Sequence, residues 1–198
     1  MNMNKHKLLS FSDEKGEIVL SKRKFLKNIV YGSLLAIGGS TVAEARIGHF
    51  PSHKTLSFEH IHTGDRLRLT YFEQGRYLRD ALAEINYLLR DFRTGSVHPI
   101  DTDLLDQLYD LKLLLGIRRP FHIVSGYRSP STNAKLRRAS RGVSKHSLHM
   151  QGRAIDIRVE RMDVRLIRNA AIHMARGGVG YYPGSDFVHL DTGRFRTW

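Results

Sequence analysis

The chain has 198 residues, 41% of them hydrophobic, which predicts one compact domain with a single apolar core and excludes a mostly disordered chain. It contains no cysteine, so disulfide bonds and thiolate metal ligands are excluded. With 32 basic and 19 acidic side chains its formal net charge is +13, and a positive charge of this size favours anionic polymers as partners.

The first 45 residues have the composition of an export signal. A basic stretch over 21–27 is followed by a moderately apolar run over 28–42 and by a small-x-small cleavage site over 43–45. The basic stretch is similar to a twin-arginine signal in which Lys22 replaces the first arginine. A general secretory signal and an uncleaved anchor are the alternatives. We therefore expect an export signal over 1–45, a functional domain over 46–198, and a protein that works in the periplasm or cell envelope.

Export changes how the charge is interpreted. Residues 1–45 hold seven of the 32 basic and four of the 19 acidic side chains, which leaves a formal charge of +10 on the rest. Outside the cytoplasmic membrane the available polyanions are peptidoglycan and the phosphates of other envelope polymers, so nucleic acid is not expected as a partner. A basic cluster could bind such polymers, although a solvated helix face is the alternative. The cluster consists of Lys135, Arg137, Arg138, Arg141 and Lys145.

In the first half of the domain, turn residues over 63–65 predict a hairpin between strands over 55–58 and 66–72. The apolar positions over 76–93 recur with the period of an amphipathic helix. A second helix is expected over 101–116, where it begins at an aspartate cap and ends at a glycine.

The second half continues with a strand over 121–125, a short helix over 131–138, and a strand over 154–159 whose apolar and polar residues alternate. A helix capped by Asp163 is expected to end at the glycine pair 177–178. Helices and strands follow one another without regular βαβ alternation. The expected fold is therefore α+β, an antiparallel sheet flanked by helices.

Two histidines and an aspartate fall where strand phase can bring them together. Asp156 occupies the polar phase of its strand, and His189 alternates in the same way with Val188 and Leu190. If the two strands share a sheet, both side chains lie on one surface. His149 precedes Asp156 by seven residues, and the intervening Gly152 permits a turn. Two histidines and a carboxylate are the protein ligands of many catalytic zinc sites, so a hydrolase is the first hypothesis.

These residues also carry a family resemblance. The pattern Ser-x-His-x-x-Gly-x-Ala-x-Asp over 147–156 is followed by Phe-Val-His-Leu-Asp over 187–191. Together with Ser-Gly-Tyr-Arg-Ser over 125–129 and Gly-Gly-Val-Gly-Tyr-Tyr-Pro over 177–183, it resembles the M15 family of zinc peptidases, which includes D-Ala-D-Ala carboxypeptidases and dipeptidases. The resemblance extends from about residue 56 to residue 198.

The resemblance implies a role for the histidines, the aspartate and the arginine of these motifs. His149, Asp156 and His189 would bind one zinc ion per chain, in a fold shared with DD-peptidases and the Hedgehog signalling domain. Arg128 would stabilise the oxyanion that forms during amide hydrolysis, for which a permanently charged donor is suited. The alternative for Arg128 is a structural salt bridge.

The general base is the least defined part of the motif. Several M15 enzymes carry a glutamate three residues before the last histidine ligand, and this chain has Asp186 there. Asp186 also follows Pro183 and Gly184, where an aspartate is an ordinary turn residue. Asp191 is the competing candidate, because it shares a strand face with His189 and could act as base or orient a ligand.

Four other histidines are further candidates for metal ligands. His146 could replace His149 if the local turn differs, and His173 is expected on the flank of a helix. His60 and His62 alternate beside the predicted hairpin turn, where a second metal or substrate contact is the less favoured alternative to a solvated hairpin.

The resemblance thus predicts a zinc-dependent murein peptidase that hydrolyses amide bonds in peptidoglycan stem peptides, with cleavage of cross-links as the first choice. A D-Ala-D-Ala carboxypeptidase or dipeptidase is the closest alternative. A metal-bearing cell-wall binding module without turnover is the alternative from another class. The enzyme is expected to be a monomer.

Overall fold

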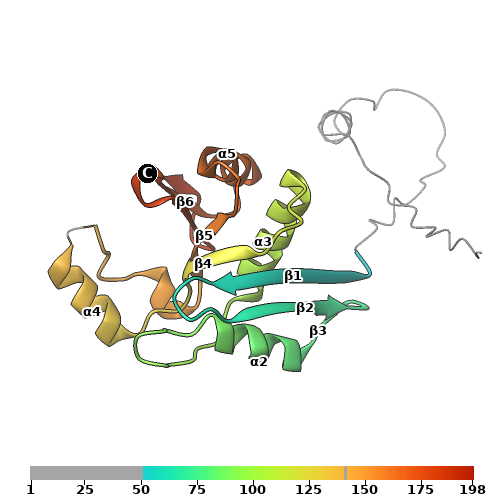
Figure 1. The fold of residues 1–198 in the computed structure, drawn as a ribbon, viewed down its shortest axis with the longest axis horizontal. Helices are drawn as coiled ribbons and strands as arrows, with labels where there is room; N and C mark the ends of the chain where they lie inside the picture. Colours follow the sequence, from blue (N-terminus) through green and yellow to red (C-terminus); the bar gives the residue numbers. More distant parts are fainter. Residues whose placement is uncertain (1–50, 141) are drawn as a thin grey trace, which may run out of the picture. The chain divides into compact units, whose positions relative to one another are not determined.

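A computed structural model of the chain describes residues 51–140 and 142–198 (Figure 1). The expected export signal over 1–45 lies outside the described residues, and so does Arg141 of the basic cluster. None of the helices within the described ranges has the length and apolar character needed to cross a membrane.

The described strands form one eight-stranded sheet in the order β3-β2-β1-β4-β5-β7-β6-β8. Neighbouring strands are antiparallel except in the pairs β1–β4 and β6–β8, which are parallel. The strands are β1 (His53–His60), β2 (Arg66–Glu73), β3 (Arg76–Tyr77), β4 (Phe121–Ser125), β5 (Ala154–Val159), β6 (Gly178–Tyr182), β7 (Phe187–Asp191) and β8 (Arg196–Thr197).

Four α-helices and two single 3-10 turns accompany the sheet in the described part of the chain, which confirms the α+β class. The caps expected at two helix starts are present: Asp101 accepts a hydrogen bond from the backbone of Asp103, and Asp163 accepts one from Arg165. The helices and turns are α2 (Arg79–Leu88), α3 (Thr102–Leu115), α4 (Pro130–Ala139), α5 (Val164–Met174), η1 (Leu148–Gln151) and η2 (Pro183–Ser185).

Two predicted helix boundaries are wrong. The helix expected over 76–93 spans only Arg79–Leu88, because Gln74 and Gly75 both have positive φ and form a tight turn that returns Arg76 and Tyr77 along β2 as a strand. The helix expected to reach 177–178 ends at Met174, where Ala175 adopts the left-handed conformation. In both cases local backbone geometry overrides the apolar period.

The sheet has one apolar and one polar face. Apolar side chains of the strands form a single core with those of α2, α3 and α5; the strand residues include Leu56, Phe58, Ile123, Ile155, Ile157, Val188 and Leu190. The side chains on the other face of the sheet are polar. Across neighbouring strands, Glu59 is paired with His122, His122 with Arg158, and Asp156 with His189. The candidate site therefore lies on the sheet face that the core leaves free.

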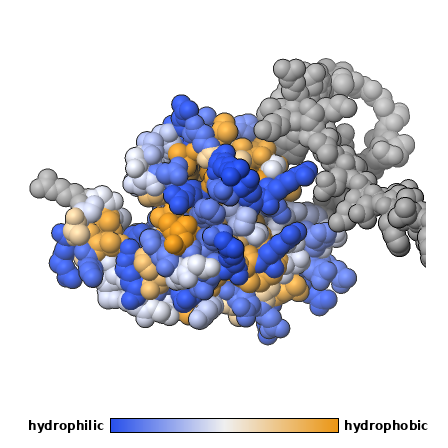
Figure 2. Space-filling view, viewed as in Figure 1, coloured by the Kyte–Doolittle hydropathy of each residue, from blue (hydrophilic) through white to orange (hydrophobic). Residues whose placement is uncertain are grey.

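The surface agrees with this division. On the face shown in Figure 2, hydrophilic residues predominate and hydrophobic ones gather in small groups. The exposed large hydrophobic residues of the described ranges include Trp198 and Phe195, which are each about half exposed.

The prediction of a solvated hairpin at His60 and His62 is wrong for His60, which is 0% exposed. Its Nδ1 accepts a hydrogen bond from the backbone of His62, and its ring meets the edge of Phe92. His62 is exposed and stacks on the same ring at 4.2 Å between centroids. Burial lowers the pKa of His60 from 6.5 to about 4, so this histidine is a neutral core residue.

Replacing His60 with leucine should flatten the pH dependence of stability between pH 7 and pH 4. The folded pKa of about 4 lies below the unfolded value of 6.5, so the unfolded chain binds the proton first. The free energy of unfolding should therefore fall as the pH drops through this window, by about 3 kcal/mol for this group. Urea unfolding at several pH values measures the slope.

The matched control is His173→Leu, which changes an exposed histidine on α5 and should keep the wild-type slope. Parallel curves for wild type and His60→Leu would show that His60 is not the group responsible.

Candidate metal and active site

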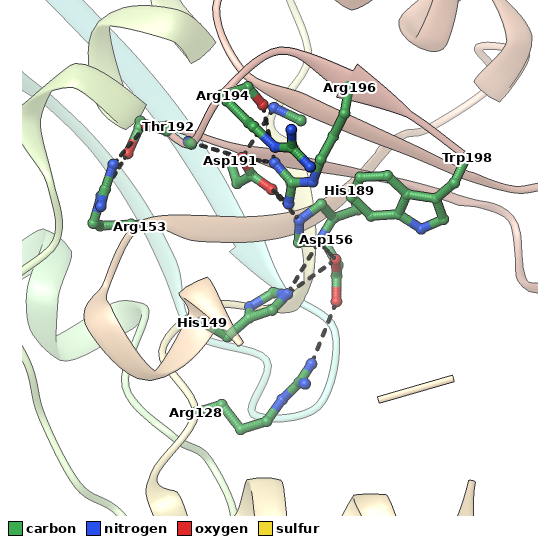
Figure 3. Close-up of polar contacts among 12 residues, drawn as sticks. Arg128, His149, Arg153, Asp156, His189, Asp191, Thr192, Arg194, Arg196 and Trp198 are labelled. Atoms are coloured by element: carbon green, nitrogen blue, oxygen red, sulfur yellow. Dashed lines mark hydrogen bonds and ion pairs between the residues drawn. The ribbon is translucent and has the colours of Figure 1, made fainter. Parts of the chain in front are cut away.

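Asp156 and His189 face each other across two neighbouring strands. They are register partners in the antiparallel pair β5–β7, so their side chains leave the sheet on the same face. Asp156 Oδ1 lies 2.8 Å from His189 Nδ1 (Figure 3). The strand phases predicted from the sequence, with Ile155 and Ile157 in the core, are confirmed.

His149 approaches this pair from η1, the turn that leads into β5. Its Nε2 lies 3.3 Å from Asp156 Oδ1 and 3.2 Å from His189 Nδ1. Gly152 ends the turn with φ 65°, and a Cβ there would lie 2.1 Å from the backbone oxygen of Pro99, so only glycine fits. Within residues 51–140 and 142–198, His149, Asp156 and His189 are the one set whose ligand atoms, all within 4.8 Å of one another, could hold a metal ion.

The outer nitrogen of each histidine has its own partner. His149 Nδ1 lies 2.7 Å from the backbone oxygen of Gly126, and His189 Nε2 lies 3.0 Å from Asp191 Oδ2. A ring nitrogen that donates outward leaves the other nitrogen to bind a metal. Two inward nitrogens and one carboxylate oxygen fit the three protein ligands of a catalytic zinc site.

Both carboxylate oxygens of Asp191 accept hydrogen bonds. It is 0% exposed and accepts hydrogen bonds from the backbone of Gly178 and Gly193, both at 2.9 Å. Arg196 Nη2 lies 2.6 Å from its second oxygen. Burial alone would raise the pKa of Asp191, but His189, Arg196 and the backbone donors outweigh it and hold the pKa well below its usual range.

The pKa values of the three clustered side chains follow from their contacts. Burial alone would raise the pKa of Asp156, but His149 and His189 outweigh it and hold that pKa well below its usual range. Burial lowers the pKa of His149. Burial also acts to lower the pKa of His189, but hydrogen bonds to Asp156 and Asp191 raise it to about 9. A metal binds ionised carboxylates and neutral imidazoles, so the lowered pKa values of Asp156 and His149 favour metal binding and the raised pKa of His189 opposes it.

Arg128 reaches the cluster from the loop after β4. Its Nη2 lies 3.8 Å from Asp156 Oδ2, and its backbone nitrogen donates to the oxygen of His149 at 3.1 Å. The loop is docked on the end of α2, where Tyr127 donates to the oxygen of Leu89 and a Cβ on Gly126 would lie 2.5 Å from that same oxygen. The loop therefore orients His149 and Arg128 together.

Asp91 anchors this loop and was not identified from the sequence. It is 1% exposed, and its Oδ2 accepts a hydrogen bond from the backbone of Ser129 at 2.9 Å. Burial would raise the pKa of Asp91, but bonds from Ser129, Thr132 and Arg93 lower it to about 2. An aspartate just beyond a helix resembles an ordinary turn residue, so the sequence carries no signal for this role.

The other predicted residues lie apart from the cluster. Asp186 has a left-handed backbone after η2, its side chain is 62% exposed, and its nearest charged partner is Arg158 at 3.5 Å. It does not line the pocket that contains the cluster. His146 is exposed at the rim of that pocket, and His173 is exposed on α5 as expected.

The pocket over the cluster has a volume of about 470 Å³. Arg128 contributes to one side of it, and an aromatic group from the end of the chain contributes to another; this group consists of Tyr182, Phe187 and Trp198. Trp198 lies beside the ring of His189, with centroids 5.2 Å apart (Figure 3). Neither Trp198 nor Arg196 was singled out from the sequence, because Arg196 belongs to the two-residue strand β8 and Trp198 directly follows it, which is too short a pattern to predict.

Comparison with known proteins places this geometry in a family. The family model described as peptidoglycan L,D-endopeptidase MepK matches residues 49–198. The protein of that name from Escherichia coli K12 is 42% identical over 172 residues, which cover 83% of this chain and 94% of the relative. The relative from Shigella flexneri has the same identity and coverage.

A protein from Haemophilus influenzae named probable peptidoglycan L,D-endopeptidase MepK is 42% identical over 149 residues, covering 75% of this chain and 80% of the relative. Residues 49–198, which the family model matches, include every residue that lines the pocket described above. The chain therefore belongs to the M15 peptidases, in the family of the peptidoglycan L,D-endopeptidase MepK.

Proposed function

We propose that this protein is a zinc-dependent murein peptidase that hydrolyses amide bonds in peptidoglycan stem peptides and cleaves their cross-links. The observation that carries the proposal is the convergence of His149, Asp156 and His189 in one pocket, in a chain whose relatives are named peptidoglycan L,D-endopeptidases. Those relatives also support an exported enzyme that acts on the cell wall.

Three inward atoms would hold the zinc: His149 Nε2, His189 Nδ1 and Asp156 Oδ1. A zinc ion bound there would supply Lewis acidity, which lowers the pKa of water towards roughly 7 and polarises an amide carbonyl. Gly126 and Asp191 would keep the two imidazole rings aligned by accepting hydrogen bonds from their outer nitrogens.

Arg128 would bind the carbonyl oxygen of the scissile amide. Its guanidinium is largely buried, beside the candidate metal ligands, and it keeps its charge throughout the working pH range. A fixed donor in a site of low dielectric stabilises the negative charge that develops on this oxygen. Asn133 and Ser125, at 3.4 and 3.5 Å, would limit the movement of the side chain.

Neither of the two aspartates that are candidates for the general base is placed to act as one. Asp186 lies outside the pocket with Arg158, so its proton has no short route to the reacting atoms. Asp191 is fully buried behind His189 and already accepts from several donors. We assign Asp191 the orientation of His189 and Asp186 no part in proton transfer.

The described members of the basic cluster could bind the anionic wall. Lys135, Arg137 and Arg138 are exposed on α4, and Lys145 is exposed in the segment that follows it. Since Ser140–Ser147 contributes several residues to the pocket, this positive surface adjoins the site.

The central test is digestion of purified sacculi with the zinc-loaded protein, followed by separation of the muropeptides by mass. Cross-linked dimers should fall to monomers. Removal of the metal with a chelator should stop the reaction and added zinc should restore it, while His189→Ala should abolish cleavage.

His173→Ala, which removes an exposed histidine remote from the pocket, is the matched control and should cleave like the wild type. Loss of terminal alanine alone would indicate a carboxypeptidase instead. Sacculi that are bound but chemically unchanged would indicate a binding module.

The roles of the two aspartates can be separated by amide substitutions. Asp191→Asn should weaken zinc affinity roughly 10- to 100-fold, because the ring of His189 loses its carboxylate acceptor. Asp186→Asn should leave both zinc affinity and cleavage near wild type. Zinc titration with a competing chelator and the muropeptide assay give the two readouts; a large loss of cleavage in Asp186→Asn with zinc still bound would restore Asp186 as the base.

A further inference from the structure

Trp198, on the aromatic side of the pocket, makes many contacts for a residue that is half exposed. Trp198 is about half exposed, yet its backbone pairs with both Val179 and Tyr181, its indole meets His189, and the guanidinium of Arg196 lies 5.0 Å from its ring centroid. Gly180 makes room for it, since a Cβ there would lie 2.7 Å from the indole. The position of the Trp198 ring is therefore fixed from several directions.

Trp198 in turn fixes one polar atom of the pocket. Its Nε1 donates a hydrogen bond to the hydroxyl oxygen of Tyr182 at 2.8 Å. The Tyr182 ring is stacked on Phe187, with centroids 4.5 Å apart and planes 17° apart. Because the hydroxyl oxygen accepts from the indole, its own hydrogen must point elsewhere. Within the described ranges, no hydrogen bond donated by this hydroxyl is found.

Tyr182 is one of the residues that line the pocket, so its hydroxyl hydrogen can turn toward a substrate bound there. Tyr182 occupies the same strand phase as Gly180, which is the register partner of His189, so its side chain leaves the sheet on the face of the candidate ligands. Arg128 reaches the same pocket from the loop after β4.

Packing alone does not account for the hydroxyl. A phenylalanine at position 182 would keep the stack on Phe187, and the indole nitrogen is exposed enough to be satisfied by water. A donor that is held by a fixed partner at the wall of a pocket is an arrangement that can stabilise developing charge.

We propose that the Tyr182 hydroxyl is a second hydrogen-bond donor to the scissile carbonyl oxygen, opposite Arg128, and that Trp198 is a positioning residue that holds this hydroxyl in its donating orientation. The inference rests on the proposed amide hydrolysis. Tyr182 keeps its proton throughout: it donates a hydrogen bond to the oxygen as negative charge develops there and releases that bond when the carbonyl re-forms.

The test uses the full zinc-loaded protein and cross-linked muropeptide dimers isolated from sacculi. Tyr182→Phe should lower kcat by roughly 10²- to 10³-fold, the usual loss on removing one oxyanion donor, with a much smaller change in KM and unchanged zinc content. Tyr181→Phe is the matched control, because Tyr181 occupies the opposite phase of β6, packs against the core and lies under Arg168. It should keep wild-type kinetics.

A double-mutant cycle tests the positioning role. Trp198→Phe keeps an apolar ring beside His189 and removes only the donor to Tyr182, so it should lower kcat by roughly tenfold with zinc content unchanged. In the Tyr182→Phe background the same substitution should have almost no effect, because no hydroxyl is left to orient.

The outcomes are distinct. A Tyr182→Phe enzyme that matches Tyr181→Phe would overturn the donor role, and additive losses in the cycle would overturn the positioning role, in both cases with the proposed hydrolysis intact. A wild-type protein that binds zinc but leaves the dimers uncleaved would overturn the proposed function and this inference together.

Discussion

The pairing of Asp156 with His189 across β5 and β7 is the constraint on which the site depends. Side chains on a strand alternate between faces, so a slip of one residue in either strand would move one ligand into the core face. The register is held by the apolar residues on either side of Asp156 and His189 along the two strands. Ile155 pairs with Leu190 and Ile157 pairs with Val188, and all four belong to the core. Core packing thus fixes the geometry of the polar cluster on the other side of the sheet.

Each charge in this cluster is compensated, which makes its burial tolerable. An unpaired buried carboxylate is costly, and Asp156 and Asp191 are both buried. Asp156 contacts two histidines and lies near Arg128, while Asp191 accepts from His189, Arg196 and two backbone nitrogens. His189 links the two carboxylates, because one of its ring nitrogens contacts Asp156 and the other contacts Asp191. The M15 membership of the chain agrees with this arrangement, and so does the eight-stranded sheet that the described residues form.

Much of the fold and of the candidate cluster could be predicted from the sequence because the signals are local. Period-two alternation placed Asp156 and His189 on polar strand phases, and the spacing of His149 and Gly152 indicated the turn between them. Residues that act through distant contacts gave no such signal. Asp91 bonds to a loop 38 positions away, and the burial of His60 depends on Phe92, which lies beyond the next helix. Likewise, Trp198 reaches the pocket only through the pairing of β8 with β6. These contacts arise from tertiary packing, which no local pattern reports.

The central claim is that one zinc ion binds between His149, Asp156 and His189 while Asp191 holds His189 from behind. Anomalous diffraction at the zinc edge from crystals of the metal-loaded protein tests it most directly. The account predicts a single zinc peak bonded to His149 Nε2, Asp156 Oδ1 and His189 Nδ1, with His189 Nε2 still donating to Asp191. A zinc peak held by His146 or Asp186, or a His189 ring turned so that Nε2 binds the metal, would contradict it.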